Sequence, residues 1–252
     1  MIKLDAKVKR LTRRINIMPE NSEKVVGILG GMGPEATVDL MQRIIRLTPA
    51  TDDIDHIRCI VDNNPKVPSR IRAIIEGNGT DPGPCMADMG KRLEKWGADF
   101  LVIACNTAHA YYEYVQQAVD IPVIHLIDLV VERAMEMFPH SRKIGILAST
   151  AVQMTGLYIK RFKPLGIEAI YPDSEQQQNL FKLIRQIKTG NTGTTVISQY
   201  QQICEHLKMQ KAEFAIIACT ELSVLSADLP IKTIDAAEIL AQEIVNIAKN
   251  GK

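Results

Sequence analysis

The sequence predicts an α/β protein with two similar lobes, each a parallel sheet flanked by helices, related by a pseudo-two-fold axis. Three observations predict this fold. Apolar strand-like segments alternate with helical segments, each half opens on a similar apolar run, and each half ends one strand on Ala-Cys. At 252 residues the chain is long enough for two modest lobes.

Short apolar runs that stop at glycine or polar residues are typical of strands buried on both faces of a parallel sheet. The first run, KVVGILGG, stops at glycines, and the second, HIRCIVDNN, ends in a polar loop with prolines. Strands are predicted over residues 24–31, 56–64, 99–106, 121–128, 143–150, 168–172, 213–220 and 231–235.

The segments between the strands repeat apolar residues at the spacing of an amphipathic helix. In PEATVDLMQRIIRLT, for example, the proline stands at the helix start that suits it. Helices are predicted over residues 34–48, 86–98, 129–138, 152–166, 175–191, 194–211 and 236–250.

The two halves repeat in register. A shift of 114 residues places Cys105 on Cys219 and Phe100 on Phe214, and DIPVIHLID then faces DLPIKTID. This repetition predicts a duplication. The predicted division is a basic N-terminal tail over residues 1–24, a first lobe over 25–124 plus 232–252, and a second lobe over 125–231.

The composition favours a small-molecule partner. The chain is 46% hydrophobic and 23% charged, and its net charge of +1 predicts no attraction to nucleic acid or to a membrane surface. No apolar stretch approaches the ~18 residues of a membrane span, and the start of the chain lacks the apolar region of a secretory signal, so we expect a cytoplasmic protein. The basic tail is interpreted as solvated, with docking on another subunit as the alternative.

The cysteines do not indicate a disulfide framework or a metal site. Five cysteines is an odd number, and no Cys-x-x-Cys or His-x-x-x-His spacing occurs. We therefore expect reduced thiols, namely Cys59, Cys85, Cys105, Cys204 and Cys219.

Cys105 and Cys219 each follow a strand, and ligands of parallel α/β sheets bind beyond the carboxyl ends of strands. Each is also expected to precede a helix start, which can lower the pKa of a thiol. Two thiols that face one carbon from opposite sides suit a reaction in which one removes a proton and the other returns one. A single cysteine at a strand end is more often a small buried apolar residue than a reactive one. The acid/base interpretation therefore rests on the occurrence of Cys105 and Cys219 as a pair in matching sequence contexts.

The motifs GILGGMGPEAT, NNPKVPSR, ACNTAH, KTGN and ACTEL, in this order, resemble the cofactor-independent aspartate/glutamate racemase family, and within it the aspartate racemase branch. The resemblance covers almost the whole chain after about residue 25. It implies two Rossmann-like lobes with the active site between them, in which Cys105 and Cys219 are the two acid/base residues. It also implies that the substrate is a small dicarboxylic amino acid, that no pyridoxal phosphate or metal is needed, and that the protein is a homodimer.

The same resemblance implies the residues that bind substrate. Arg70 and Lys188 resemble the cationic pair that holds the side-chain carboxylate, for which Arg offers a bidentate fork and Lys a point charge. The groups that resemble donors to the α-carboxylate are Asn106, Thr107 and Thr220. The remaining predicted substrate contacts are Gly31, Met32, Gly33 and Glu221. Glu221 can instead satisfy amides at a helix start, and His109 is interpreted as structural.

The chain departs from its sister glutamate racemases at two places. Those proteins have Asp-Ser-Gly where this chain has GGMG at residues 30–33, and a histidine where it has Glu221. Both departures favour the aspartate branch. The chain also lacks the family's usual Gly-Thr near Ala151 and Val152, within residues 148–155, which bears on substrate size.

Other functions stay open from the sequence. One is a related hydantoin racemase or maleate isomerase, against which Arg70 and Lys188 argue because a neutral hydantoin side chain has no use for two cations. Another is a catalytically silent protein that only binds amino acids.

Overall fold

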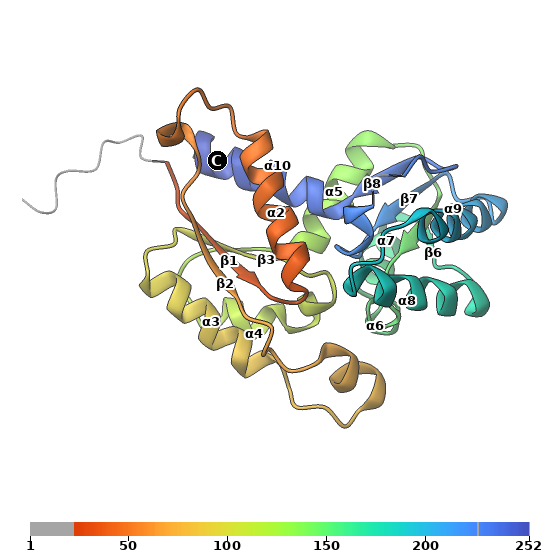
Figure 1. The fold of residues 1–252 in the computed structure, drawn as a ribbon, viewed down its shortest axis with the longest axis horizontal. Coiled ribbons are helices and arrows are strands. Elements are labelled where there is room, and N and C mark those ends of the chain that lie inside the picture. The colour runs from red at the N-terminus through yellow and green to blue at the C-terminus, as the bar shows by residue number, and fades with distance from the viewer. Residues whose placement is uncertain (1–22, 226, 252) are drawn as a thin grey trace, which may run out of the picture.

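The computed structural model describes residues 23–225 and 227–251 and contains two four-stranded parallel sheets side by side (Figure 1). The first sheet has the order β2-β1-β3-β4, with β1 (Val26–Gly30), β2 (Cys59–Asn63), β3 (Phe100–Ile103) and β4 (Val123–Ile124). The second has the order β6-β5-β7-β8, with β5 (Lys143–Leu147), β6 (Glu168–Ile170), β7 (Phe214–Ile217) and β8 (Thr233–Asp235). The predicted α/β fold is confirmed; residues 1–22 of the predicted tail lie outside the described residues.

Helices flank both sheets. They are α2 (Pro34–Leu47), α3 (Gly83–Lys95), α4 (Tyr112–Gln116), α5 (Leu126–Met137), α6 (Thr150–Thr155), α7 (Leu157–Phe162), α8 (Ser174–Lys188), α9 (Thr194–Met209) and α10 (Ala236–Asn250). Shorter turns are the 3-10 turns Asp53–Asp55, Thr107–Tyr111, Lys163–Leu165 and Leu222–Val224 and the π-helical turn Arg72–Glu76. Within the described part of the chain, no helix combines the length and the apolar character that a membrane crossing needs.

The two sheets have the same internal register at the strands that carry the cysteines. In the first lobe the Ala104 amide donates to the Leu29 carbonyl at 3.0 Å, and in the second the Ala218 amide donates to the Leu147 carbonyl at 2.8 Å. Both alanines are one residue beyond their strand and directly precede a cysteine. The duplicated backbone therefore delivers the two cysteines to equivalent places.

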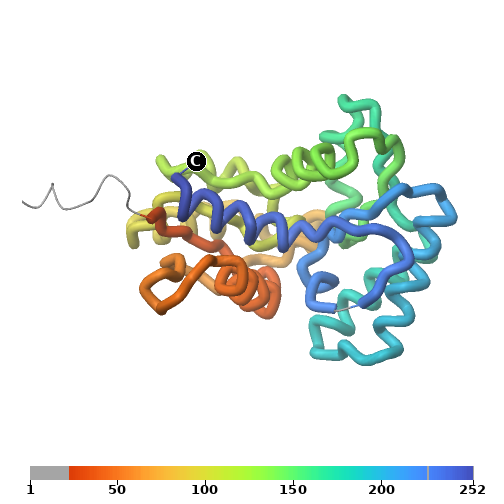
Figure 2. The backbone as a smooth tube through the Cα atoms, turned by 90° about the horizontal axis from the view of Figure 1, so that it is seen from above, coloured from red at the N-terminus to blue at the C-terminus, as the bar shows by residue number. Residues whose placement is uncertain are grey.

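One continuous apolar core joins the lobes. It contains Ile28 and Val102 of the first sheet together with Ile146 and Ile216 of the second, all fully buried. Helices α5 and α10 contribute to the same core and contact each other, and α10 runs from the second lobe back along the first (Figure 2). The two sheets are thus held as one packed unit.

The strand pairing differs from the predicted lobe boundary at one place. Residues 232–235 were assigned to the first lobe, but β8 pairs with β7 in the second sheet, with Ile234 beside Ile216. The helix that follows, α10, packs on α2 of the first lobe. The chain therefore crosses back after β8 rather than before it, and the rest of the predicted division stays a prediction.

The strand predicted over residues 121–128 is wrong in its second half. Only Val123–Ile124 pairs with β3, and α5 begins at Leu126. The change is caused by His125, whose side chain accepts a hydrogen bond from the Asp128 amide at 3.2 Å and so caps the helix start.

The single helix predicted over residues 152–166 is also wrong. Gly156 adopts the left-handed conformation, with φ of 65°, and separates α6 from α7. Glycine pays no steric penalty there, whereas the apolar pattern continues on both sides of it and conceals the break.

A buried cluster of charges connects the two lobes around Arg43 of α2. The Arg43 Nε lies 2.6 Å from the Asp39 Oδ2, and its Nη1 lies 3.0 Å from the Asp235 Oδ2 and 2.8 Å from the Glu238 Oε2. Its Nη2 donates to the Ser223 carbonyl at 2.9 Å. Only a tenth of the Arg43 side chain is exposed. This cluster ties the first lobe to the loop after Cys219 and to the start of α10.

Replacing Arg43→Leu is expected to lower the free energy of unfolding by about 3 kcal/mol, the lower end of the range for a broken buried ion pair, because it leaves three partly buried carboxylates without their cation. Urea denaturation measures the loss. The matched control is Arg46→Leu, because Arg46 pairs with the same Glu238 but is 63% exposed, so its removal should cost no more than about 1 kcal/mol. Equal losses in the two variants would show that the buried cluster does not join the lobes.

Candidate active site

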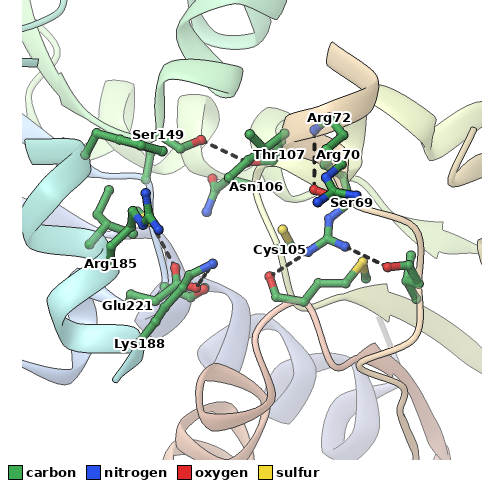
Figure 3. A pocket seen from close by; sticks show the side chains of 18 of the residues that line it. Ser69, Arg70, Arg72, Cys105, Asn106, Thr107, Ser149, Arg185, Lys188 and Glu221 are labelled. Carbon is green, nitrogen blue, oxygen red and sulfur yellow. Dashed lines mark hydrogen bonds and ion pairs between the residues drawn. The ribbon is translucent and has the colours of Figure 1, made fainter. Parts of the chain in front are cut away.

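A cavity of about 600 Å³ lies between the lobes, beyond the carboxyl ends of both sheets. Cys105, which follows β3, and Cys219, which follows β7, both line it. Side chains from the two lobes face each other across this space (Figure 3). The structure therefore brings the two repeated cysteines to one place.

The other predicted site residues gather at the same place. Those that line the cavity with the cysteines are Met32, Arg70, Asn106, Thr107, Lys188, Thr220 and Glu221. Gly31 and Gly33 line a smaller adjoining cavity of about 300 Å³, which shares Met32, Arg70, Lys188 and Glu221. Gly31 has φ of 86°, and a Cβ there would come within 2.2 Å of the Asn64 backbone, so this turn requires glycine.

The Cys105 loop is held from behind by His109. The His109 Nε2 accepts a hydrogen bond from the Leu126 amide at 3.1 Å, so the proton of the neutral ring lies on Nδ1, which donates to the Cys105 carbonyl at 2.8 Å. Burial, together with the neighbouring His125, lowers the pKa of His109 to about 3. His109 is buried and has a structural contact on each ring nitrogen.

Asn106 presents an amide donor in the cavity lining. Its Oδ1 accepts a hydrogen bond from the Tyr158 hydroxyl at 2.7 Å, while its buried Nδ2 has no partner among the described residues. Burial raises the pKa of Tyr158 well above its usual value, so the phenol keeps its proton and needs Oδ1 as acceptor. Tyr158 thereby fixes which end of the amide stays free.

Thr107 connects the first lobe to a serine that the sequence analysis missed. The Thr107 Oγ1 lies 3.1 Å from the Ser149 Oγ, and Ser149 also caps α6 by accepting from the Val152 amide at 3.3 Å. Ser149 lines the cavity, whereas Ala151 and Val152 point into buried surroundings. The segment that departs from the family pattern therefore contributes one polar group to the cavity.

The Cys219 thiol contacts the ion pair between Glu221 and Lys188. Its Sγ donates a hydrogen bond to the Glu221 Oε2 at 3.0 Å, and the Glu221 Oε1 lies 2.9 Å from the Lys188 Nζ. Burial first and the Glu221 charge second raise the pKa of Cys219 well above its usual value. Burial opposes the charge of Lys188, but the attraction of Glu221 outweighs it, so the pKa of Lys188 is raised.

The prediction that a helix start lowers the thiol pKa is therefore wrong for Cys219. Only the 3-10 turn Leu222–Val224 follows it, too short to act as a helix dipole, and the nearest charge is a carboxylate. Cys105 is likewise followed by a 3-10 turn, Thr107–Tyr111.

Arg70 is held by backbone carbonyls. Its Nη1 donates to the Val67 carbonyl at 3.3 Å and to the Pro68 carbonyl at 3.1 Å, and its Nη2 donates to the Met32 carbonyl at 3.4 Å. Its Nε is buried without a partner among the described residues. These contacts orient the guanidinium without neutralising its charge.

The sequence analysis missed two further cations in the lining, Arg72 and Arg185. Arg185 lies three residues before Lys188 on α8, so the two share a helix face, and this spacing could have revealed it. Arg72 lies in the π-helical turn, for which no pattern in the sequence gave a signal.

Two duplicated α/β lobes enclose one cavity and each supplies a cysteine to it, an arrangement that suits a two-lobed α/β isomerase. A sequence profile described as Asp/Glu/hydantoin racemase matches residues 29–244. The chain belongs to this family, and the resemblance and the enzyme class, an isomerase, are confirmed.

Relatives agree with this assignment. The chain is 32% identical over 231 residues to the broad specificity amino-acid racemase RacX of Bacillus subtilis, covering 88% of this chain and 97% of that protein. The aspartate racemase of Picrophilus torridus superposes with a TM-score of 0.79 at 28% identity, covering 89% of this chain and 94% of that one. The glutamate racemase RacE1 of Bacillus anthracis shares the fold, with a TM-score of 0.65 at 20% identity over 92% of this chain and 84% of that one.

The buried His109 should make stability depend on pH. The folded protein holds the ring neutral down to a pKa of about 3, whereas the unfolded chain takes up a proton near the ordinary value of about 6.5. The unfolded state therefore binds more protons in this window, and stability falls as the pH falls. Between pH 7 and pH 5 the loss from this group is about 2 kcal/mol.

Urea denaturation at both pH values tests this expectation. The variant His109→Gln should be less stable at pH 7 but should lose less further stability at pH 5 than the wild type does. The exposed His140 is the control, and His140→Gln should keep the wild-type pH dependence. An unchanged slope in His109→Gln would contradict the neutral buried ring.

Proposed function

We propose that the protein is an amino-acid racemase that interconverts L- and D-aspartate, with glutamate as a further substrate, by a two-base mechanism without a cofactor. The observation that carries the proposal is that Cys105 and Cys219, from equivalent positions of two lobes, line one cavity. The family match and the aspartate racemase among the structural relatives support it.

In the proposed reaction, the thiolate of one cysteine removes the Cα proton and the thiol of the other delivers a proton to the opposite face. The Cα proton is a very weak acid, so the carbanion-like intermediate needs hydrogen bonds to the α-carboxylate as charge builds there. The Asn106 amide and the hydroxyls of Thr107 and Thr220 are suited to this role. Each well-placed donor contributes about 3–4 kcal/mol to such a transition state.

The charge of the cavity supports an anionic substrate. Among the described residues its lining has four cationic side chains and two carboxylates, namely Arg70, Arg72, Arg185, Lys188, Glu76 and Glu221. In the proposal, Arg70 and Lys188 hold the side-chain carboxylate of aspartate, and the remaining cations attract it to the cavity.

A second candidate function is racemisation of amino acids with other side chains. It is favoured by the ion pair between Lys188 and Glu221, which already neutralises one of the two cations expected to bind a side-chain carboxylate. The relative named as a broad specificity racemase supports it as well. A panel of acidic, neutral and basic amino acids, with a hydantoin and maleate added, separates the candidates and the related isomerase activities.

The homodimer and the cytoplasmic location stay proposals that follow from the family resemblance and the composition. Sedimentation equilibrium of the full chain tests the dimer. A single species of monomer mass at assay concentration would reject it.

Incubation with L-aspartate in deuterated water tests the reaction and its mechanism. D-aspartate that carries deuterium at Cα should accumulate, because the proton returned comes from an exchanged thiol. Cys105→Ser and Cys219→Ser should each slow this reaction by about 10²–10⁴. Cys85→Ser is the matched control, because Cys85 lies in α3 and does not line the cavity, and its rate should not change.

Binding of aspartate without deuterium exchange would reject the racemase and support a protein that only binds amino acids. Full activity in either serine variant at Cys105 or Cys219 would reject the two-base mechanism while leaving the racemase in place.

Tyr158→Phe tests the role of Asn106. Without the hydroxyl the amide is free to turn, so we expect kcat to fall roughly tenfold with little change in KM, less than the about 10²–10³ of a deleted donor. Tyr171→Phe is the control, because the Tyr171 hydroxyl is also buried but has no partner among the residues that the structure describes. Equal rates in the two variants would show that Tyr158 does not orient the amide.

A further inference from the structure

Glu221 is the buried charge in closest contact with a proposed acid/base residue. It is only 8% exposed, and its two oxygens are divided between the Cys219 Sγ at 3.0 Å and the Lys188 Nζ at 2.9 Å. One oxygen accepts the Cys219 hydrogen bond and the other forms the ion pair with Lys188, so the substrate contact predicted for Glu221 would have to compete with both. Figure 3 shows the carboxylate beside Lys188 at the wall of the cavity.

The equivalent position of the first lobe carries no charge. The shift of 114 residues that places Cys105 on Cys219 places Thr107 on Glu221. Thr107 is uncharged and contacts the Ser149 hydroxyl rather than the cysteine before it. The duplicated backbone thus carries two cysteines in different electrostatic surroundings.

We propose that Glu221 is a positioning residue that holds the proton of Cys219 in the empty site and makes its thiolate a stronger base. The carboxylate accepts the S–H hydrogen bond and so fixes the orientation of Sγ toward its partner. The proposal rests on the proposed function, because it assigns a role within the two-base reaction.

Neither proton transfer of the proposed reaction requires the Glu221 carboxylate to carry a proton. When Cys219 acts as the acid, its S–H bond breaks, a C–H bond forms at Cα, and a thiolate is left beside the carboxylate. When it acts as the base, the C–H bond at Cα breaks, the thiolate takes the proton, and the new S–H group again donates a hydrogen bond to Glu221. Repulsion between the two negative charges raises the proton affinity of the thiolate, which favours removal of a weakly acidic proton.

Several charged or titratable groups near Cys219 determine the proton affinity of its thiol. Glu221 raises the proton affinity of the Cys219 thiol, and Lys188 of α8 lowers it. Tyr200 of α9 interacts electrostatically with Cys219. Cys105 interacts electrostatically with Lys188. Arg70 and Arg185 line the same cavity. Removing Glu221 and removing Lys188 should therefore shift the thiol in opposite directions.

The experiment measures alkylation of Cys219 by iodoacetamide as a function of pH, with the Cys219 peptide quantified by mass spectrometry. In Glu221→Gln, which keeps the size of the side chain, the pH of half-maximal alkylation should move down. Because a weaker base is also a weaker nucleophile, the rate at pH 8 should rise roughly three- to fourfold for each unit by which the thiol pKa falls.

Three further variants make the test specific. Lys188→Met should move the half-maximal pH up, and Glu221→Asp, which withdraws the carboxylate by one methylene, should lie between wild type and Glu221→Gln. The matched control is Glu76→Gln, because Glu76 is an exposed carboxylate of the same lining without a contact to Cys219, and its profile should match wild type. If Glu221→Gln fails to fold, the upward shift in Lys188→Met still tests the charge balance.

A second measurement connects the thiol to turnover. The alkaline limb of kcat/KM for racemisation should move to lower pH in Glu221→Gln, and equally for both enantiomers because their equilibrium constant is one. An alkylation profile of Glu221→Gln identical to wild type would overturn the proposal even in an active enzyme. A shifted profile without deuterium exchange would overturn the proposed function and leave the assignment of the Cys219 proton in place.

Discussion

The shared apolar core is the constraint on which the site depends. Two sheets that each end a strand on a cysteine bring those cysteines to one cavity only if the sheets cannot turn relative to each other. Helices α5 and α10 bury their apolar faces between the sheets, and the Arg43 cluster fixes the loop after Cys219 to the same region. The core removes apolar surface from water without directional preference, whereas the buried arginine accepts only one arrangement of its carboxylates.

Duplication sets backbone positions but not electrostatics. The amides of Ala104 and Ala218 make equivalent hydrogen bonds, so the two sulfur atoms start from equivalent places. What surrounds them then diverges: an orienting histidine lies behind Cys105, and a carboxylate contacts Cys219. In the proposed two-base reaction the two cysteines hold different numbers of protons at any moment, and different surroundings give the two thiols different proton affinities.

The sequence predicts features that are local in the chain and fails where contacts are distant. The strands and the paired cysteines could be predicted because buried parallel strands are continuous apolar runs, and the repeat places Cys105 over Cys219. The break at Gly156 escaped because the apolar pattern continues through it. The helix start at Leu126 escaped because it is capped by His125, which is not one of the residue types preferred at helix starts. The pairing of Glu221 with Lys188, 33 positions apart, has no pattern in the sequence.

The ion pair between Lys188 and Glu221 connects the class of substrate to the protonation of Cys219. A neutral side chain would leave Lys188 paired with Glu221 and the thiol as it is in the empty site. A side-chain carboxylate would share the Lys188 ammonium, and the Glu221 charge would then be less compensated and would hold the Cys219 proton more tightly. Under the proposed function, binding of a dicarboxylate would therefore raise the proton affinity of Cys219. If Lys188 binds the substrate carboxylate and Glu221 holds the Cys219 proton, as proposed, their ion pair couples substrate selectivity to the strength of the base, and a substitution at either residue should change both.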